Sequence, residues 1–197
     1  MATAFKDNEK EFIKEKLKEV AYDCLLKYGV KKTTVDQIVQ MTGIAKGSFY
    51  KFYDSKEILF FTVLEEYQKS IMYELINKFK EEEYIGVDKF TQLIYGLYQK
   101  VRQSFIMNII KNNEFEYLMR KLPKDLIANH HSLDDILAKN IFLHIKIKEG
   151  VNIDVVTASL RAIFMSMMHI EEIGEKYIEE VLKLLIKGLA IQIVEEN

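Results

Sequence analysis

One proline, one cysteine, eight glycines and no tryptophan occur among the 197 residues, and these scarcities limit the possible folds. With so few residues that break helices, long helices are favoured over many short strands. Cys24 is the only cysteine and cannot close a disulfide within the chain, which fits a reducing compartment. The expected fold class is all-α, in one domain or two small ones.

Targeting, membrane and catalytic signatures are also missing. We find no signal-peptide pattern and no run of roughly 18 apolar residues that would cross a bilayer, so we expect a cytoplasmic protein with no membrane partner. No zinc-spaced set of Cys and His, Walker loop, dinucleotide fingerprint or G-x-S-x-G motif occurs. We therefore expect no enzyme activity, no metal site and no cofactor.

Charge is distributed unevenly along the chain. Between Lys27 and Lys56, six lysines outnumber two aspartates, a net charge of +4, whereas the whole chain carries −2. The other residues must therefore carry −6, the difference between these two values. A basic segment on a mildly acidic body is typical of a protein with a nucleic-acid-binding head.

The basic segment contains a pattern of two short helices joined by a tight turn. Thr34 and Gln37 have the spacing of a capping box, and Gly43 suits the left-handed conformation at a helix end. A second short helix is expected over about 45–52, with Phe49 pointing inward. This is the arrangement of a helix-turn-helix, whose second helix enters the DNA major groove.

The run GIAKGSFYKFYDSKEIL at 43–59, preceded by TTVDQI at 33–38, resembles the DNA-binding domain of TetR-family (TetR/AcrR-like) bacterial transcriptional regulators. One departure is Ala45, where the family commonly has a Ser or Thr that caps the recognition helix. The resemblance implies a three-helix DNA-binding domain over 1–54 and a larger helical ligand-binding and dimerisation domain over 55–197.

Candidate DNA contacts lie around the helix-turn-helix. Residues with hydroxyl or ammonium donors are expected to bind phosphates, and these are Thr33, Thr34, Ser48, Tyr50 and Lys56. Lys46 and Lys51 are expected to reach base edges, and Gly47 lets the backbone come close to the DNA. For Tyr50, a place in the core is the alternative.

Further helices are expected over about 9–28, 55–83, 87–112, 114–121, 132–148, 154–173 and 175–195. The resemblance implies a small-molecule site in this body. Aromatic and sulfur side chains with a few polar tips are candidates to line it: Tyr95, Tyr98, Phe105, Phe115, Phe142, Met165, Met168 and His169. Plain core packing is the alternative for each of them.

The last two predicted helices carry apolar residues on more than one face. Such helices must be buried on both sides, so we expect a second copy of the chain to cover them. The predicted dimer interface consists of Phe164, Met168, Ile178, Val181, Leu185, Gly188 and Leu189. The resemblance implies the same homodimer, and burial within one chain is the alternative.

Together these patterns predict a ligand-responsive dimeric DNA-binding regulator. It would be a repressor, released from a palindromic operator in double-stranded DNA by a small hydrophobic effector. The main alternative is a helical protein that binds a hydrophobic molecule or a partner and has lost specific DNA binding. A metal-dependent enzyme is a more distant third. Steeply salt-dependent duplex binding would separate the first reading from the second.

Overall fold

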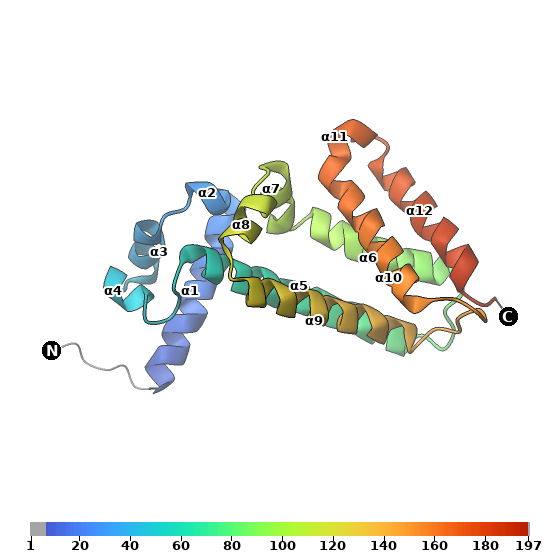
Figure 1. Ribbon diagram of the computed structural model, residues 1–197, viewed down its shortest axis with the longest axis horizontal. Coiled ribbons are helices and arrows are strands. Elements are labelled where there is room, and N and C mark those ends of the chain that lie inside the picture. Colours follow the sequence, from blue (N-terminus) through green and yellow to red (C-terminus); the bar gives the residue numbers. More distant parts are fainter. Residues whose placement is uncertain (1–6, 197) are drawn as a thin grey trace. The chain divides into compact units, whose positions relative to one another are not determined.

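The computed structural model describes residues 7–196, and within them the side chains of 131–135, 137 and 138 lie outside the description. Over the described residues the chain is helical, with one isolated antiparallel bridge between Ile147 and Val194 and no strand. The predicted all-α class is confirmed (Figure 1). The helices are α1 (Asp7–Lys27), α2 (Gly29–Lys32), α3 (Val35–Thr42), α4 (Lys46–Phe49), α5 (Lys56–Glu81), α6 (Val87–Arg102), α7 (Phe105–Lys111), α8 (Phe115–Lys121), α9 (Lys124–Phe142), α10 (Ile153–Ser166), the 3-10 turn η1 (Met167–His169), α11 (Ile170–Ile173) and α12 (Ile178–Ile193).

Several predicted helix boundaries are wrong. The helix expected over 87–112 is two helices, because the side chain of Ser104 accepts a hydrogen bond from the amide of Ile106 and starts α7. α9 begins directly after Pro123 rather than at Ser132, in keeping with the preference for proline at helix starts. The four-residue helix α2 was not predicted at all.

The chain forms two compact units. Unit 1 comprises the residues up to Tyr67 together with Ser104–Ile127, and unit 2 comprises Gln68–Gln103 with the residues from Ala128 onward. Helices α5 and α9 therefore contribute to both units, and α7 and α8 belong with the N-terminal helices. The boundary predicted between residues 54 and 55 concerns the DNA-binding role and stays a prediction.

The core of unit 1 is built on α1. This helix packs against α3 and α7, and its Leu17 and Leu25 are fully buried. Ile38 of α3 and Phe49 of α4 are also fully buried, so the two helices of the helix-turn-helix are anchored in the same core.

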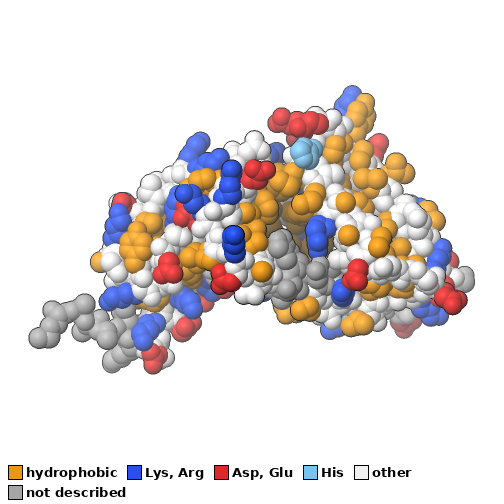
Figure 2. All heavy atoms as spheres, viewed as in Figure 1, with side chains coloured by type: hydrophobic (Ala, Val, Ile, Leu, Met, Phe, Trp, Pro, Cys, Tyr) orange, Lys and Arg blue, Asp and Glu red, His pale blue; other side chains and the backbone are white. Residues whose placement is uncertain are grey.

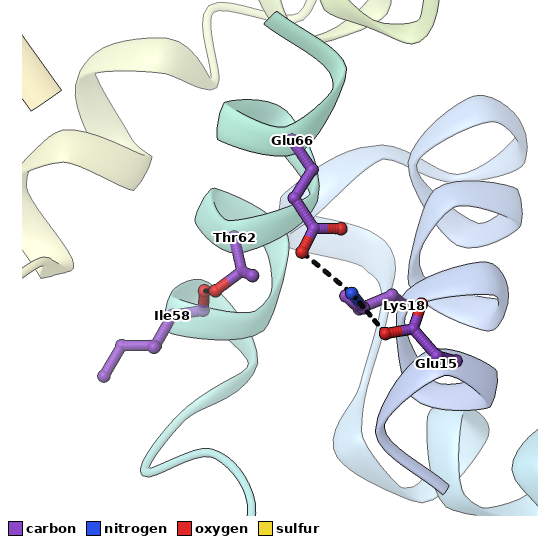
Figure 3. Close-up of polar contacts among 5 residues, drawn as sticks. All are labelled: Glu15, Lys18, Ile58, Thr62 and Glu66. Atoms are coloured by element: carbon purple, nitrogen blue, oxygen red, sulfur yellow. Dashed lines mark hydrogen bonds and ion pairs between the residues drawn. The ribbon is translucent and has the colours of Figure 1, made fainter. Parts of the chain in front are cut away.

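A polar contact adds to this packing between α1 and α5. The ammonium of Lys18 lies 2.7 Å from a carboxylate oxygen of Glu15 and 2.8 Å from one of Glu66 (Figure 3). Burial works to lower the pKa of Lys18, but the hydrogen bonds to these carboxylates outweigh it and hold the pKa above its usual range. Thr62 donates to the carbonyl of Ile58 in the same part of α5. Lys18 therefore links α1 to α5.

In unit 2, α12 packs against α6 and α10. One side of α12 is completely buried by them, at Ile178, Leu182, Ile186 and Ala190. The hydroxyl of Tyr98 on α6 donates to the carbonyl of Leu160 on α10, over 2.7 Å. After α12 the chain runs back to the start of α6, where the carboxylate of Glu196 accepts from the amide of Val87 at 2.8 Å.

By length and composition alone, the helical stretch Ile153–Ile173 could cross a membrane, with a mean hydropathy of 1.4. It is not an unbroken apolar run, because Asp154, Arg161, Glu171 and Glu172 lie within it, so the expected absence of a membrane span stays a prediction. One such stretch is weak evidence for a membrane span, because apolar helices at protein interfaces have the same composition. This one is also interrupted by η1 and is mostly unburied.

Candidate nucleic-acid interface

The first helix of the helix-turn-helix, α3, has the predicted caps. The hydroxyl of Thr34 accepts from the amide of Gln37 at 3.2 Å, and the Gln37 side chain accepts from the amide of Thr34 at 2.8 Å. Gly43 ends the helix in the left-handed region, with φ of +78°, and its amide donates to the carbonyl of Val39. The capping box and the glycine end predicted from sequence are both confirmed.

The second helix, α4, is shorter than predicted. It spans Lys46–Phe49, and the residues that follow it are a turn. Ala45 precedes it without a side-chain cap, and Gly47 within it has low helix propensity, so little local chemistry stabilises the helix. Phe49 holds α4 in place instead, because its side chain is fully buried and its ring contacts those of Tyr50 and Tyr53.

Most of the predicted DNA contacts lie on the outer face of these two helices. Thr34, Lys46, Gly47, Tyr50 and Lys51 are exposed, and Ser48 is partly exposed. Tyr50 is 50 % exposed, so its alternative role as a core residue is wrong. Asp36 on α3 holds the ammonium of Lys46 at 3.0 Å, and its carboxylate raises the pKa of Lys46.

Thr33 and Lys56 lie differently from what we predicted. Thr33 is fully buried, and its hydroxyl donates to the carbonyl of Gly29 at 2.7 Å. The ammonium of Lys56 donates to the carbonyls of Val30 and Thr33, at 2.7 Å and 2.5 Å. Both side chains donate to backbone carbonyls of α2 or of Thr33, which directly follows it. In this structure both side chains support the head.

The residues predicted to line one ligand site are divided between the two compact units. Phe105 and Phe115 belong to unit 1, whereas Tyr95, Tyr98, Phe142, Met165, Met168 and His169 belong to unit 2. Phe105 is core, fully buried with its ring centroid 5.1 Å from that of Tyr22 and 5.3 Å from that of Tyr67. Met165, Met168 and His169 are exposed on α10 and η1. The sequence gives the side-chain types but not which of them share a cavity.

An open groove of about 280 Å³ in unit 2 is lined by Tyr95, alone among the predicted ligand residues. Its walls come from α5 and α6 and include Glu74, Lys78 and Lys100. Both lysines pair with Glu74, and Lys100 and Lys78 together hold the pKa of Glu74 below its usual range. This charged and open groove is not the enclosed apolar site that the sequence predicts.

The predicted dimer residues lie on α12, α10 and η1, and they differ in exposure. The assignment of Ile178 to the dimer interface is wrong, because this residue is fully buried between the helices of its own chain. Leu185 and Gly188 are exposed, Val181, Leu189 and Phe164 are partly exposed, and Met168 of η1 is exposed. Further exposed apolar residues outside the predicted set lie on or beside these helices: Val155, Met165, Tyr177, Leu184 and Ile191. Hydrophobic side chains gather over α10 to α12 in Figure 2.

The comparisons with known proteins agree with this geometry. Residues 17–63, which include α3 and α4, match the family model of bacterial regulatory proteins of the tetR family. No curated protein of similar sequence was found. Several solved structures have the same fold over almost the whole chain.

Three of these structures illustrate the likeness. FadR from Bacillus subtilis, in complex with stearoyl-CoA, is 15% identical with a TM-score of 0.63, over 90% of this chain and 98% of its own. Thermus thermophilus FadR, a repressor in complex with lauroyl-CoA, is 13% identical with a TM-score of 0.65, over 93% and 96%. SmeT, the repressor of the Stenotrophomonas maltophilia multidrug efflux pump SmeDEF, is 14% identical with a TM-score of 0.64, over 93% and 91%.

At these identities the solved structures establish the fold, and the family model establishes the kind of DNA-binding head. The exposed helix-turn-helix and the family match over that same segment thus lead to one assignment: this chain carries the DNA-binding head of the tetR family of bacterial regulatory proteins, and it shares its fold with solved regulators over almost its whole length.

Proposed function

We propose that this protein is a dimeric repressor that binds a palindromic operator in double-stranded DNA and is released by a small hydrophobic molecule. The observation that carries the DNA-binding part is the outer face of α3 and α4. Lys46 of α4 is exposed there, as are Tyr50 and Lys51 in the turn that follows, while Phe49 is fully buried. A short helix held by one buried ring, with its donors turned outward, suits insertion into the major groove.

Within this proposal the predicted contacts have two roles. Thr34, Ser48 and Tyr50 donate to phosphates and fix the register of the head, and Lys46 and Lys51 reach base edges. Gly47 presents no side chain, and nothing lies within 4 Å of the position that a Cβ would occupy, so the backbone of α4 can approach the DNA. Lys and Arg side chains visible over the helices of unit 1 in Figure 2 add a general attraction to the duplex.

The homodimer follows from the exposed apolar side of α10 and α12. Leu184 is 74% exposed and Leu185 is 43% exposed on α12, and Met165 on α10 is 53% exposed. Monomeric proteins rarely leave such a contiguous apolar surface in water. A second copy covering it would present two heads related by a two-fold axis, which favours a palindromic operator.

The effector we propose is an apolar small molecule bound by unit 2. Two of the similar structures hold fatty acyl-CoA molecules, and a third represses a multidrug efflux pump. Tyr95, Tyr98 and Phe142 are the predicted ligand residues of unit 2 that are buried. To release DNA, the effector must bind more tightly to a conformation whose two heads no longer match the operator.

The test is selection of bound duplexes from a random pool at near-physiological salt. The wild type is compared with Tyr50→Ala Lys51→Ala, and with Tyr73→Ala Lys80→Ala as a control that removes an exposed Tyr and Lys from α5. We expect the wild type and the control to enrich one palindrome and the head variant to enrich none. Equal enrichment by the head variant would refute this placement of the interface.

The alternative, a helical binding protein without specific DNA binding, is favoured by one observation. Ala45 leaves α4 without a side-chain cap, and the helix is only four residues long. If well-folded wild-type dimer enriches no duplex, and its weak binding shows no steep salt dependence, this alternative replaces the repressor.

A further inference from the structure

We infer that Glu114 is a positioning residue for DNA binding, because its carboxylate holds α2 and thereby sets where the helix-turn-helix begins. The residue lies in the turn between α7 and α8, far from the head in sequence but in the same compact unit. The effect of Glu114 on DNA affinity rests on the proposed function, whereas the contact of its carboxylate with α2 does not.

Both carboxylate oxygens of Glu114 are engaged at the start of α2. One oxygen lies 2.6 Å from the amide nitrogen of Val30, and the other lies 2.9 Å from that of Lys31. Glu114 is buried, and Tyr28, which precedes α2, makes no side-chain cap of its own. Hydrogen bonds to a charged acceptor are about twice as strong as neutral ones, so Glu114 supplies the cap that α2 lacks.

Gly29 leaves room for this contact. Its φ is +77°, a conformation that side chains other than glycine rarely adopt. A Cβ at Gly29 would also lie 2.5 Å from a carboxylate oxygen of Glu114. Glycine is therefore required both by the backbone conformation and by the closeness of the carboxylate.

The other end of α2 is held with the opposite charge. Lys56, in the first turn of α5, donates to the carbonyls of Val30 and Thr33. α2 is thus bracketed by a carboxylate at its amides and an ammonium at its carbonyls. Only Thr33 and Thr34 separate α2 from α3, so a shift of α2 moves the start of the helix-turn-helix.

The turn that carries Glu114 is itself tied to α1 and α2. Asn113 adopts φ of +50°, and its carbonyl accepts from the ammonium of Lys31 at 3.3 Å. The side-chain amide of Asn108 donates to the carbonyl of Leu26 at 2.9 Å. The backbone of the turn that carries the carboxylate is therefore held against α1 and α2. Because of these contacts, a displacement of the turn would also displace α2.

The course of the chain explains why this contact matters for regulation. The polypeptide passes between the two units at three places: within α5 after Tyr67, before Ser104, and after Ile127. Two of these three crossings enter and leave the segment that contains Glu114. A rearrangement of unit 2 therefore reaches this segment through both of its ends, and Glu114 is its charged, doubly hydrogen-bonded contact with α2.

The experiment compares Glu114→Gln with Glu116→Gln in the full chain. Gln keeps the shape of the side chain but removes the charge, and it turns an amide group toward a backbone donor. Glu116 is the matched control, because it is exposed and, among the described residues, its carboxylate has one ion pair, with Arg120 at 3.8 Å. The first readout is amide hydrogen exchange without DNA, and the second is affinity for the duplex that the wild type selects.

We expect Glu114→Gln to speed exchange at the amides of Val30 and Lys31 at least 10-fold and to weaken operator binding at least 10-fold. Exchange at Ile38 and Val39, inside α3, should stay as in the wild type, and Glu116→Gln should stay within twofold in both readouts. Should Glu114→Gln fail to fold, Glu114→Asp takes its place, because it keeps the charge but shortens the reach.

Three results would overturn the inference: unchanged exchange at Val30 and Lys31, unchanged operator affinity, or equal acceleration throughout α3, which would mean general unfolding of the head. A wild type that selects no duplex would instead refute the proposed function. In that case the exchange at Val30 and Lys31 would still decide whether Glu114 holds α2.

Discussion

Leu184→Glu should dissociate the proposed dimer. Leu184 is 74% exposed on the apolar side of α12. Full burial of a leucine is worth about 1.5–3 kcal/mol, so covering the exposed part contributes about 1–2 kcal/mol for each copy. A two-fold interface contains the residue twice, so the two leucines together contribute about 2–4 kcal/mol to the free energy of dimerisation. Losing this contribution would raise the dimer dissociation constant roughly 30- to 700-fold. Burying the new carboxylate without a partner would weaken it further.

The assay is sedimentation equilibrium over a range of protein concentrations. Leu143→Glu is the matched control, because Leu143 is 76% exposed but follows α9 and lies outside the proposed interface. We expect the wild type and Leu143→Glu to associate alike, and Leu184→Glu to be monomeric at concentrations where they are dimeric. A dimer of unchanged affinity in Leu184→Glu, or a monomeric wild type, would refute the assignment of this surface.

Two further predictions concern the head. Asp36→Asn removes the carboxylate that holds Lys46 at 3.0 Å and frees this ammonium for the base edge assigned to it, so duplex affinity should rise by up to about fivefold, the effect of losing one exposed ion pair; duplex titrations test this, and an unchanged affinity would place Lys46 away from the DNA. Tyr53→Phe removes a buried hydroxyl that has no hydrogen-bond partner among the described residues, so at pH 8 the variant should be as stable as the wild type or up to about 1–3 kcal/mol more stable. Burial raises the pKa of Tyr53 from 10.0 to about 12, so the unfolded chain releases this proton first and the wild type loses stability between about pH 10 and 12, a loss that the variant lacks. Urea unfolding at pH 8 and 11 measures both effects, and a less stable variant at pH 8 would show that the hydroxyl has a partner.

The features that the sequence determines by itself depend on residues a few positions apart. Thr34 and Gln37 cap each other across one turn, and Gly43 supplies a left-handed helix end, whatever the rest of the chain does. The scarcity of proline and glycine likewise favours helices everywhere. These local causes are why the all-α class and the helix-turn-helix were predicted correctly.

Other features depend on partners distant in sequence, and only the tertiary structure decides them. Thr33 and Lys56 were assigned to phosphates because their side chains carry donors, but the short helix α2 offers them closer acceptors. Helical periodicity marks Ile178 and Leu185 equally as apolar, and only the packing of α6 and α10 buries the first and leaves the second exposed.

Glu114 shows this limit most clearly. In the sequence it is one of many glutamates, at the start of the short helix expected over 114–121. In the structure its carboxylate meets the amides of Val30 and Lys31, more than eighty residues away. Whether a charge is solvated or buried depends on which backbone groups the fold brings to it, and hydrogen-bond geometry of that kind leaves no periodic trace in the sequence.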